Sequence, residues 1–218
     1  IDIKSDTTWA TSFQDRQVNI LNGATLTVSV PMALDTVMME EDAQVVFTAT
    51  EGKLTARSLR FAPLLSATGW KAFGMPFTSA VIKNSTEEEI SAPSTQNVDN
   101  GIWFARLKDN KTPEFVVDES AFGMAGLWAA NGDTYTISSE GAFEFKTLEE
   151  PAAPTETGTF LMCSNPNTFT ITLKQSAYIL TADGTSFEQE ANPEIKPFQS
   201  FVLTDAKTLS TLRSLRIG

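Results

Sequence analysis

Apolar and polar side chains alternate most clearly in the last third of the chain. In the run 168–173, threonine alternates with Phe, Ile and Leu, which is the period-two pattern of a half-buried β-strand. Two further β-type runs cover 177–180 and 198–203, and the Asp183-Gly184 pair between them is a strong hairpin signal. Short strands separated by turn signals at this spacing predict an all-β fold.

The N-terminal region, residues 1–65, contains a weak internal repeat. The segment 22–28 is echoed nineteen positions later by 41–47, and a shorter echo occurs at 52–56. In each unit a turn-prone residue precedes a short alternating apolar run. A period near twenty is typical of a stacked, solenoid-like β-coil in which each rung covers the next. A plain meander of hairpins explains the same echoes, and both interpretations stay open at this point.

The remaining residues, 66–218, are interpreted as a β-sandwich built of two related halves. A Thr-Gly pair, an aromatic-rich run and a Pro turn begin both 66–148 and 158–218, and the connector between them, 149–157, is rich in Pro and Glu. The predicted fold is therefore an N-terminal stacked β region followed by a two-part sandwich. Helix is expected only as short turns near Ser85 and after Thr208.

Composition restricts the chemistry. The formal net charge of −11 argues against nucleic acid and anionic membranes as partners, and no apolar run is long enough to span a membrane. The chain has no histidine, which removes Ser-His-Asp and Cys-His catalysis and nearly all zinc sites. No cofactor, metal or enzymatic activity is expected. The chain begins at Ile1 rather than Met, which indicates a processed or trimmed chain whose targeting segment, if any, is missing.

Three segments carry a resemblance to a group of bacterial proteins. They are Gly69-Trp70 leading to Met75-Pro76-Phe77, the tract from Ala177 to Phe187, and Ile195-Lys196-Pro197-Phe198 to Phe201. These segments resemble the C-terminal β modules of secreted and cell-surface proteins from Bacteroides and related gut bacteria. The N-terminal region is similar to the β-coils that often precede such modules. The resemblance implies an extracellular or cell-surface location and a β fold, but no reaction.

The four tryptophans are the first candidate binding residues, because a flat exposed ring stacks on the face of a sugar. The alternative is that they fill the core, which is the usual place of a Trp within a strand pattern. Trp103 follows a turn at 99–101, and Trp128 precedes a turn at 131–133. Since both rings lie near loop ends, Trp103 and Trp128 are the predicted ligand-binding residues, ahead of Trp9 and Trp70.

Other candidate sites have simpler explanations. Asp99, Asn100, Asn131 and Asp133 offer oxygen ligands for calcium, but Asx-Gly pairs between strands are usually hairpin turns. The acidic clusters 87–89, 118–119 and 149–150 offer carboxylate pairs for glycoside hydrolysis, but such runs are usually solvated. Cys163, the only cysteine, lies in an apolar run and is interpreted as a small buried hydrophobe.

These observations predict a non-enzymatic recognition or adhesion module of a secreted or cell-surface protein. Its expected partner is an extracellular glycan or a surface protein, with glycan as the first ligand class to test. The alternative is a structural spacer or C-terminal module that supports another domain. Carboxylate-based glycoside hydrolysis is a third, enzymatic hypothesis.

Overall fold

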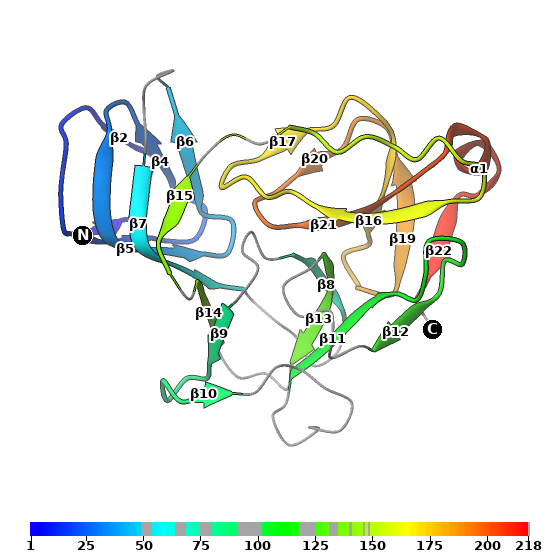
Figure 1. The fold of residues 1–218 in the computed structure, drawn as a ribbon, viewed down its shortest axis with the longest axis horizontal. Coiled ribbons are helices and arrows are strands. Elements are labelled where there is room, and N and C mark those ends of the chain that lie inside the picture. The colour runs from blue at the N-terminus through cyan, green and yellow to red at the C-terminus, as the bar shows by residue number, and fades with distance from the viewer. Residues whose placement is uncertain are drawn as a thin grey trace.

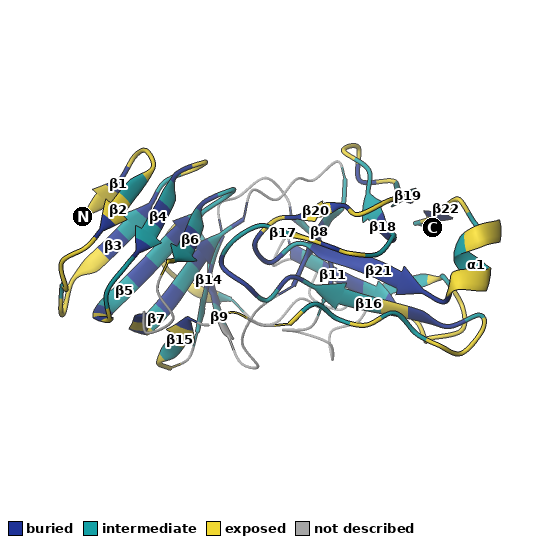
Figure 2. Ribbon diagram, turned by 90° about the horizontal axis from the view of Figure 1, so that it is seen from above, coloured by how far each residue is buried: buried dark blue, intermediate teal, exposed yellow. Residues whose placement is uncertain are grey.

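The computed structural model describes residues 1–48, 54–63, 69–74, 80–90, 102–117, 125–130, 135–139, 141–145, 147 and 149–217. Strands account for 51% of these residues and helix for 3%. The predicted all-β class is therefore confirmed. The N- and C-termini lie at opposite ends of the molecule (Figures 1 and 2).

Two parallel sheets form the N-terminal part, where their strands stack side by side (Figure 2). The first sheet contains β1 (Asp2–Ile3), β3 (Gln17–Ile20), β5 (Met32–Glu40) and β7 (Leu54–Ala62). The second contains β2 (Thr7–Trp9), β4 (Thr25–Val28) and β6 (Gln44–Phe47). Because successive strands alternate between the two sheets, each rung lies on the one before it, as in a solenoid.

The strand register matches the sequence repeat. Leu26 pairs with Thr7 on one side and with Val45 on the other, each nineteen residues away. Parallel pairing excludes the meander of hairpins for this region, since hairpin strands are antiparallel. The third echo, at 52–56, is misplaced: Leu54 pairs with Met32 in the first sheet. The alternation of apolar and polar residues shows which side chains of a strand are buried, but it does not show which other strand pairs with it.

The core of these two sheets is apolar and close-packed. Its fully buried side chains form one cluster and include Val18, Ile20, Leu26, Val28, Val37, Met39, Val45 and Leu59. Burying each such side chain contributes about 1.5–3 kcal/mol relative to exposure, before the entropy of ordering the chain is subtracted. The alternating pattern of the rungs is thus explained by one face that packs inward and one that meets solvent.

Four antiparallel strands continue the first sheet beyond β7. They are β9 (Ala80–Lys83), β10 (Glu89–Ile90), β14 (Thr136–Ser139) and β15 (Phe143–Phe145). Both β14 and β15 pair directly with β7. Strands from both sides of the boundary predicted at residue 65 therefore share one sheet, while residue 65 itself lies outside the described residues. The turn near Ser85 is not helical: Glu87 has a φ of 63°, and the Asn84 Oδ1 accepts hydrogen bonds from the backbone N–H groups of Thr86 and Glu88.

The rest of the chain forms three further sheets (Figure 1). A four-stranded sheet contains β8 (Lys71–Phe73), β11 (Ile102–Leu107), β12 (Phe115–Val117) and β13 (Gly126–Ala130). A five-stranded sheet contains β16 (Phe160–Ser164), β18 (Ala177–Leu180), β19 (Ser186–Glu190), β21 (Ser200–Thr204) and β22 (Ser214–Arg216). The short strands β17 (Ile171–Thr172) and β20 (Glu194–Ile195) pair with each other, and α1 (Ala206–Thr211) precedes β22.

Side chains of the four- and five-stranded sheets share one apolar cluster, in which Phe115 stacks on Phe187 with ring centroids 5.3 Å apart. Strands from 80–145 divide between two sheets, whereas 160–216 supplies the whole five-stranded sheet. The two related halves of a sandwich therefore stay a prediction. The hairpin predicted at Asp183-Gly184 joins β18 to β19 and is confirmed.

Only the end of the predicted strand 168–173 is a strand. Thr168, expected on the polar face, is buried, because its hydroxyl donates to the Val45 carbonyl oxygen (3.0 Å) and its own carbonyl accepts from the Val45 N–H (2.7 Å). The loop 165–170 therefore covers the edge strand β6, whose backbone groups are otherwise left without a ladder partner.

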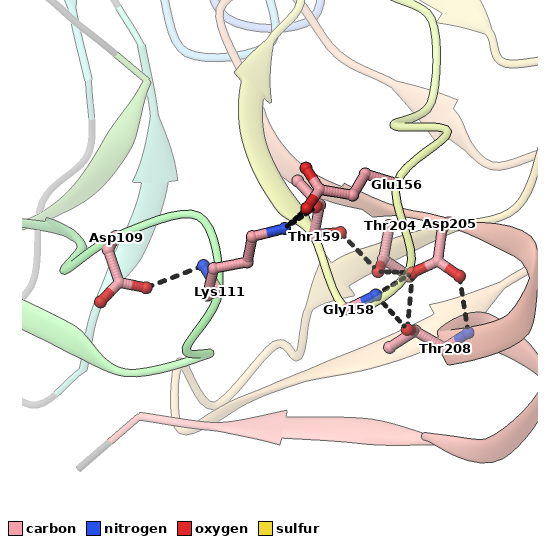
Figure 3. A network of polar contacts seen from close by, with 8 residues as sticks. All are labelled: Asp109, Lys111, Glu156, Gly158, Thr159, Thr204, Asp205 and Thr208. Atoms are coloured by element: carbon pink, nitrogen blue, oxygen red, sulfur yellow. Dashed lines mark hydrogen bonds and ion pairs between the residues drawn. The ribbon is translucent and has the colours of Figure 1, made fainter.

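A polar network connects the loop after β11 with the start of β16 and with α1 (Figure 3). The Lys111 ammonium pairs with Glu156 (2.6 Å) and donates to the Thr159 hydroxyl (2.8 Å). Asp205, which is buried and caps α1, accepts from the Gly158 N–H (2.8 Å) and from the Thr208 hydroxyl (2.6 Å). Through Glu156, these contacts tie the C-terminal end of the connector 149–157 to Lys111 in the loop after β11.

Candidate functional site

We call the two stacked parallel sheets of the N-terminal part the N-terminal coil, and the four- and five-stranded sheets the C-terminal sheets. A hollow of about 610 Å³ lies where the N-terminal coil meets the C-terminal sheets. Five parts of the described chain line it: the β5–β6 turn at 41–42, Phe61 of β7, residues 69–73 with β8, residues 180–183 from the end of β18 into the β18–β19 turn, and the stretch 196–199 that precedes β21. We call it the junction hollow. Its volume is in the range of pockets that bind small molecules.

Two glycines allow two of these segments to touch. Gly184 has a φ of 69°, and a Cβ atom there would lie 2.7 Å from the Trp70 backbone nitrogen. A Cβ atom on Gly69 would lie 2.8 Å from the carbonyl oxygen of Asp183. Since real side chains do not approach backbone this closely, only glycine at both positions permits the contact. The backbone of the β18–β19 turn therefore lies in direct contact with the backbone of Gly69 and Trp70.

Trp70 is the aromatic side chain most suited to a ligand in this hollow. It is half-buried, because part of its surface packs against the cluster shared by the four- and five-stranded sheets. Phe61 and Phe73 also line the hollow, but they are buried and stack on each other with ring centroids 5.2 Å apart. Half-burial leaves part of Trp70 exposed beside the hollow, and an aromatic side chain with exposed surface offers a ligand a large apolar contact area.

Two ion pairs cross the junction hollow. Lys71 on β8 pairs with Glu41, and Lys196 pairs with Asp42 at 2.8 Å. The Lys71–Glu41 pair is mostly buried, with side chains 27% and 16% exposed, whereas the Lys196–Asp42 pair is more exposed. Both pairs join the β5–β6 turn to the C-terminal sheets, so they hold the walls of the hollow together.

Asp183 is held in place by its own turn. Its Oδ1 atom accepts hydrogen bonds from the Thr181 hydroxyl (2.6 Å), the Thr185 N–H (3.1 Å) and the Thr185 hydroxyl (2.9 Å). These bonds, above all the one from Thr181, lower the pKa of Asp183. The carboxylate therefore stays ionised at neutral pH and acts only as a hydrogen-bond acceptor.

The two predicted tryptophans do not form a site together. Trp103 pairs with Ala129 and Trp128 with Phe104 on the neighbouring strands β11 and β13. Because successive residues of a strand point to opposite faces, Trp103 and Trp128 lie on opposite sides of this sheet.

Trp128 is fully buried, with its ring edge-on to Phe73 and Phe104 at centroid distances of 5.6 and 5.2 Å. The prediction that Trp128 is an exposed binding ring is wrong, because the ring fills the core. Trp103 is half-buried on β11, and its role in binding stays a prediction. Trp9 is 9% exposed and packs on Phe13.

Among the described residues, the remaining predicted candidates bring no reactive group into the hollow. The calcium candidates Asp99, Asn100, Asn131 and Asp133, and the acidic pair 118–119, lie outside the described residues. The described part of the chain contains no cluster of three or more Cys, Asp or Glu side chains able to hold a metal. Burial raises the pKa of the Cys163 thiol to about 11, so the thiol is protonated and unreactive at neutral pH.

Proximity to loops in the sequence favours Trp103 and Trp128 over Trp70 as exposed rings. A better signal was present in the segments that carried the resemblance. Gly69-Trp70, Asp183 and Lys196-Pro197 all come from those segments, and all line the junction hollow. Glycine beside Trp and glycine in the turn were the marks of a close backbone approach.

Comparison with protein-family models, with curated proteins and with solved structures finds no significant match to this chain. Within the described residues, no helix has the length and apolar character that crossing a membrane requires.

Proposed function

We propose that this chain is a non-enzymatic recognition module of a secreted or cell-surface protein, and that it binds a saccharide in the junction hollow. The observation that carries the proposal is the half-buried Trp70 ring at the wall of a hollow that also presents a fixed carboxylate, Asp183. Sugars offer one apolar face and a rim of hydroxyl groups, and this pairing of ring and acceptor complements both.

The carboxylates of the hollow suit binding better than hydrolysis. Glycoside hydrolysis needs one carboxylic acid with a raised pKa to protonate the leaving oxygen. The pKa of Asp183 is instead lowered, and Glu41 and Asp42 are each engaged by a lysine. This arrangement favours a site that holds a ligand without transferring a proton to it.

The first test is binding of the purified protein to an array of host and dietary glycans, with and without calcium, followed by calorimetry on the best ligand. Trp70→Ala is expected to weaken binding roughly tenfold or more, because removing an aromatic contact face costs about 1.4 kcal/mol or more. Trp103→Ala is the matched control, since Trp103 is also half-buried but does not line the hollow. Loss of binding in Trp103→Ala with none in Trp70→Ala would move the site to β11.

A spacer role is the second candidate function. It is supported by the position of the two termini at opposite ends of the molecule (Figure 1), which suits a module inserted between other parts of a longer protein. A blank array on well-folded protein favours the spacer over the recognition module.

A further inference from the structure

The charges lining the junction hollow are unbalanced. Among the described residues, three carboxylates (Glu41, Asp42 and Asp183) face two ammonium groups (Lys71 and Lys196). Each lysine is already paired with a carboxylate of the β5–β6 turn. Asp183 is the carboxylate that has no lysine partner, so the excess negative charge of the hollow is located at its β18–β19 turn.

The free capacity of Asp183 lies on one oxygen. The three hydrogen bonds that Asp183 accepts from Thr181 and Thr185 all go to Oδ1, and no other described residue donates to Oδ2. The turn therefore holds the carboxylate in one orientation and leaves acceptor sites for a ligand. A fixed carboxylate that accepts from two adjacent hydroxyl groups forms charge-assisted hydrogen bonds, which are stronger than those of a neutral acceptor.

An acidic sugar meets the opposite situation. Its carboxylate cannot donate a hydrogen bond to Asp183 and is repelled by it. To find a cationic partner, it would have to take Lys71 or Lys196 away from Glu41 or Asp42. That exchange leaves a carboxylate in the hollow without its counter-charge, and the penalty is largest at the mostly buried Lys71–Glu41 pair.

We infer that Asp183 is the specificity-determining residue of the junction hollow, and that the site takes neutral saccharides with adjacent hydroxyl groups and rejects uronic acids. This inference rests on the proposed function, because it concerns the ligand class of the same site. The Trp70 ring contacts the apolar face of the sugar, and Asp183 selects the hydroxyl groups at its edge.

The test is calorimetry with matched ligands that differ only in a carboxylate: oligosaccharides of glucose against those of glucuronic acid, and of galactose against those of galacturonic acid. The wild-type protein is expected to bind the neutral member of a pair roughly tenfold more tightly or better. Asp183→Asn is expected to weaken the binding of neutral sugars by a similar factor. It is also expected to reduce the ratio of the affinity for the neutral sugar to that for its acidic counterpart. Asparagine keeps an oxygen that accepts the bonds of the turn, so the hairpin is retained.

Asp109→Asn is the matched control. Asp109 is exposed like Asp183, and its Oδ1 also accepts hydrogen bonds within a turn, here from the backbone N–H groups of Lys111 and Thr112. These bonds also lower its pKa, but Asp109 does not line the hollow. It is expected to change neither ligand preference nor affinity.

The outcomes separate the inference from the function on which it rests. Equal or tighter binding of the acidic sugars, or unchanged binding in Asp183→Asn, overturns the role of Asp183 while Trp70-dependent binding still supports the recognition module. Absence of binding to every sugar, neutral or acidic, overturns the proposed function and the inference together. The wild-type ratio alone decides the ligand class, even if the variant fails to fold.

Discussion

Single residues determine whether the junction hollow exists. Gly184 and Gly23 have nearly the same backbone conformation, with φ values of 69° and 76°. They differ in their surroundings, because a Cβ atom on Gly23 meets nothing within 4 Å, whereas one on Gly184 overlaps the backbone of Trp70. A side chain at either position would therefore be strained by the left-handed backbone conformation, but only a side chain at position 184 would also overlap the backbone of Trp70.

This difference predicts the effects of two alanine substitutions. Gly23→Ala is expected to reduce the free energy of unfolding by about 1–2 kcal/mol, the strain of a side chain in the left-handed region. Gly184→Ala adds overpacking against Trp70 and is expected to cost about 3 kcal/mol or more. Urea unfolding followed by circular dichroism measures both. Equal losses in the two variants would mean that the turn moves away from Trp70 at no cost.

Also at the scale of single residues, the alternation pattern predicts which positions of a strand face the core, but not which aromatic side chain stays partly exposed. Trp70 directly follows Gly69, Trp128 lies two residues after Gly126, and both are near loops in the sequence, so the local pattern does not distinguish an exposed ring from a buried one. They are distinguished by tertiary contacts: Phe73 and Phe104 enclose Trp128, whereas the junction hollow leaves Trp70 partly open. Those partners lie up to tens of residues away in the chain, beyond the range of any alternation pattern.

At the scale of elements, the end of the stacked coil is closed by parts of the chain distant in sequence. The loop 165–170 bonds to β6 through Thr168, and the Gln44 side chain accepts from the Thr170 N–H (2.9 Å). On the other sheet, β14 and β15 cover β7. An uncovered strand edge is a template for unwanted pairing, and these contacts remove it at this end.

The nineteen-residue repeat makes the pairing of β4 with β6 predictable, because residues that pair in these two strands are also nineteen positions apart in the sequence. The closing elements could not be predicted in this way. Thr168 follows a period-two pattern that indicates a strand with threonine facing solvent, yet it is buried by its bonds to Val45. The alternation of polar and apolar residues shows only that a segment is amphipathic. The unpaired backbone groups of the edge strand β6 require hydrogen-bond partners, and this requirement decides where Thr168 lies.

The helix α1 supplies a prediction about acid stability. Hydrogen bonds from the Thr208 hydroxyl and from the backbone N–H groups of Thr208 and Gly158 hold the pKa of Asp205 well below its usual range (Figure 3), and the Lys207 N–H adds a further bond. Because the folded-state pKa is lower than the unfolded one, ionised Asp205 stabilises the fold above about pH 4, the ordinary Asp value. This contribution is lost as the pH falls through the folded-state pKa.

Asp205→Asn is therefore expected to be less stable than the wild type at neutral pH, and the gap is expected to shrink as the pH falls below about 4. The measurement is the urea midpoint across this pH range. Glu144→Gln removes one negative charge at an exposed position of β15 and serves as the control. A gap that stays constant with pH would show that Asp205 acts by shape and not by charge.

At the scale of the whole molecule, Phe198 is the point where the parts meet. It comes from the stretch before β21, yet it belongs to the apolar cluster of the N-terminal coil. Its ring is fully buried and lies edge-on to Phe61 of β7 and to Phe73 of β8, at centroid distances of 5.0 and 6.4 Å. Its φ of 60° and the bond from the Gly74 N–H to its carbonyl (2.7 Å) hold it there.

Phe198 is thus part of the same apolar cluster as the core of the N-terminal coil, as are Phe73, Phe104 and Trp128 of the four-stranded sheet. The boundary expected at residue 65 was drawn from a change in local pattern, and that pattern contains no information about Phe198 crossing into the other core. Together with the pairing of β14 and β15 on β7, this contact predicts that the chain unfolds as one cooperative unit.

Phe198→Ala tests this cooperativity. The substitution leaves a large cavity between the cores and is expected to lower the free energy of unfolding by about 3–5 kcal/mol. Native-state hydrogen exchange should report the same loss for amides in β5 and in β21, because both depend on the shared contact. Leu161→Ala, at a position of β16 that is 42% exposed, is the control and is expected to change little. If β5 keeps its protection while β21 loses it, the N-terminal coil is independently stable and the molecule consists of two folding units.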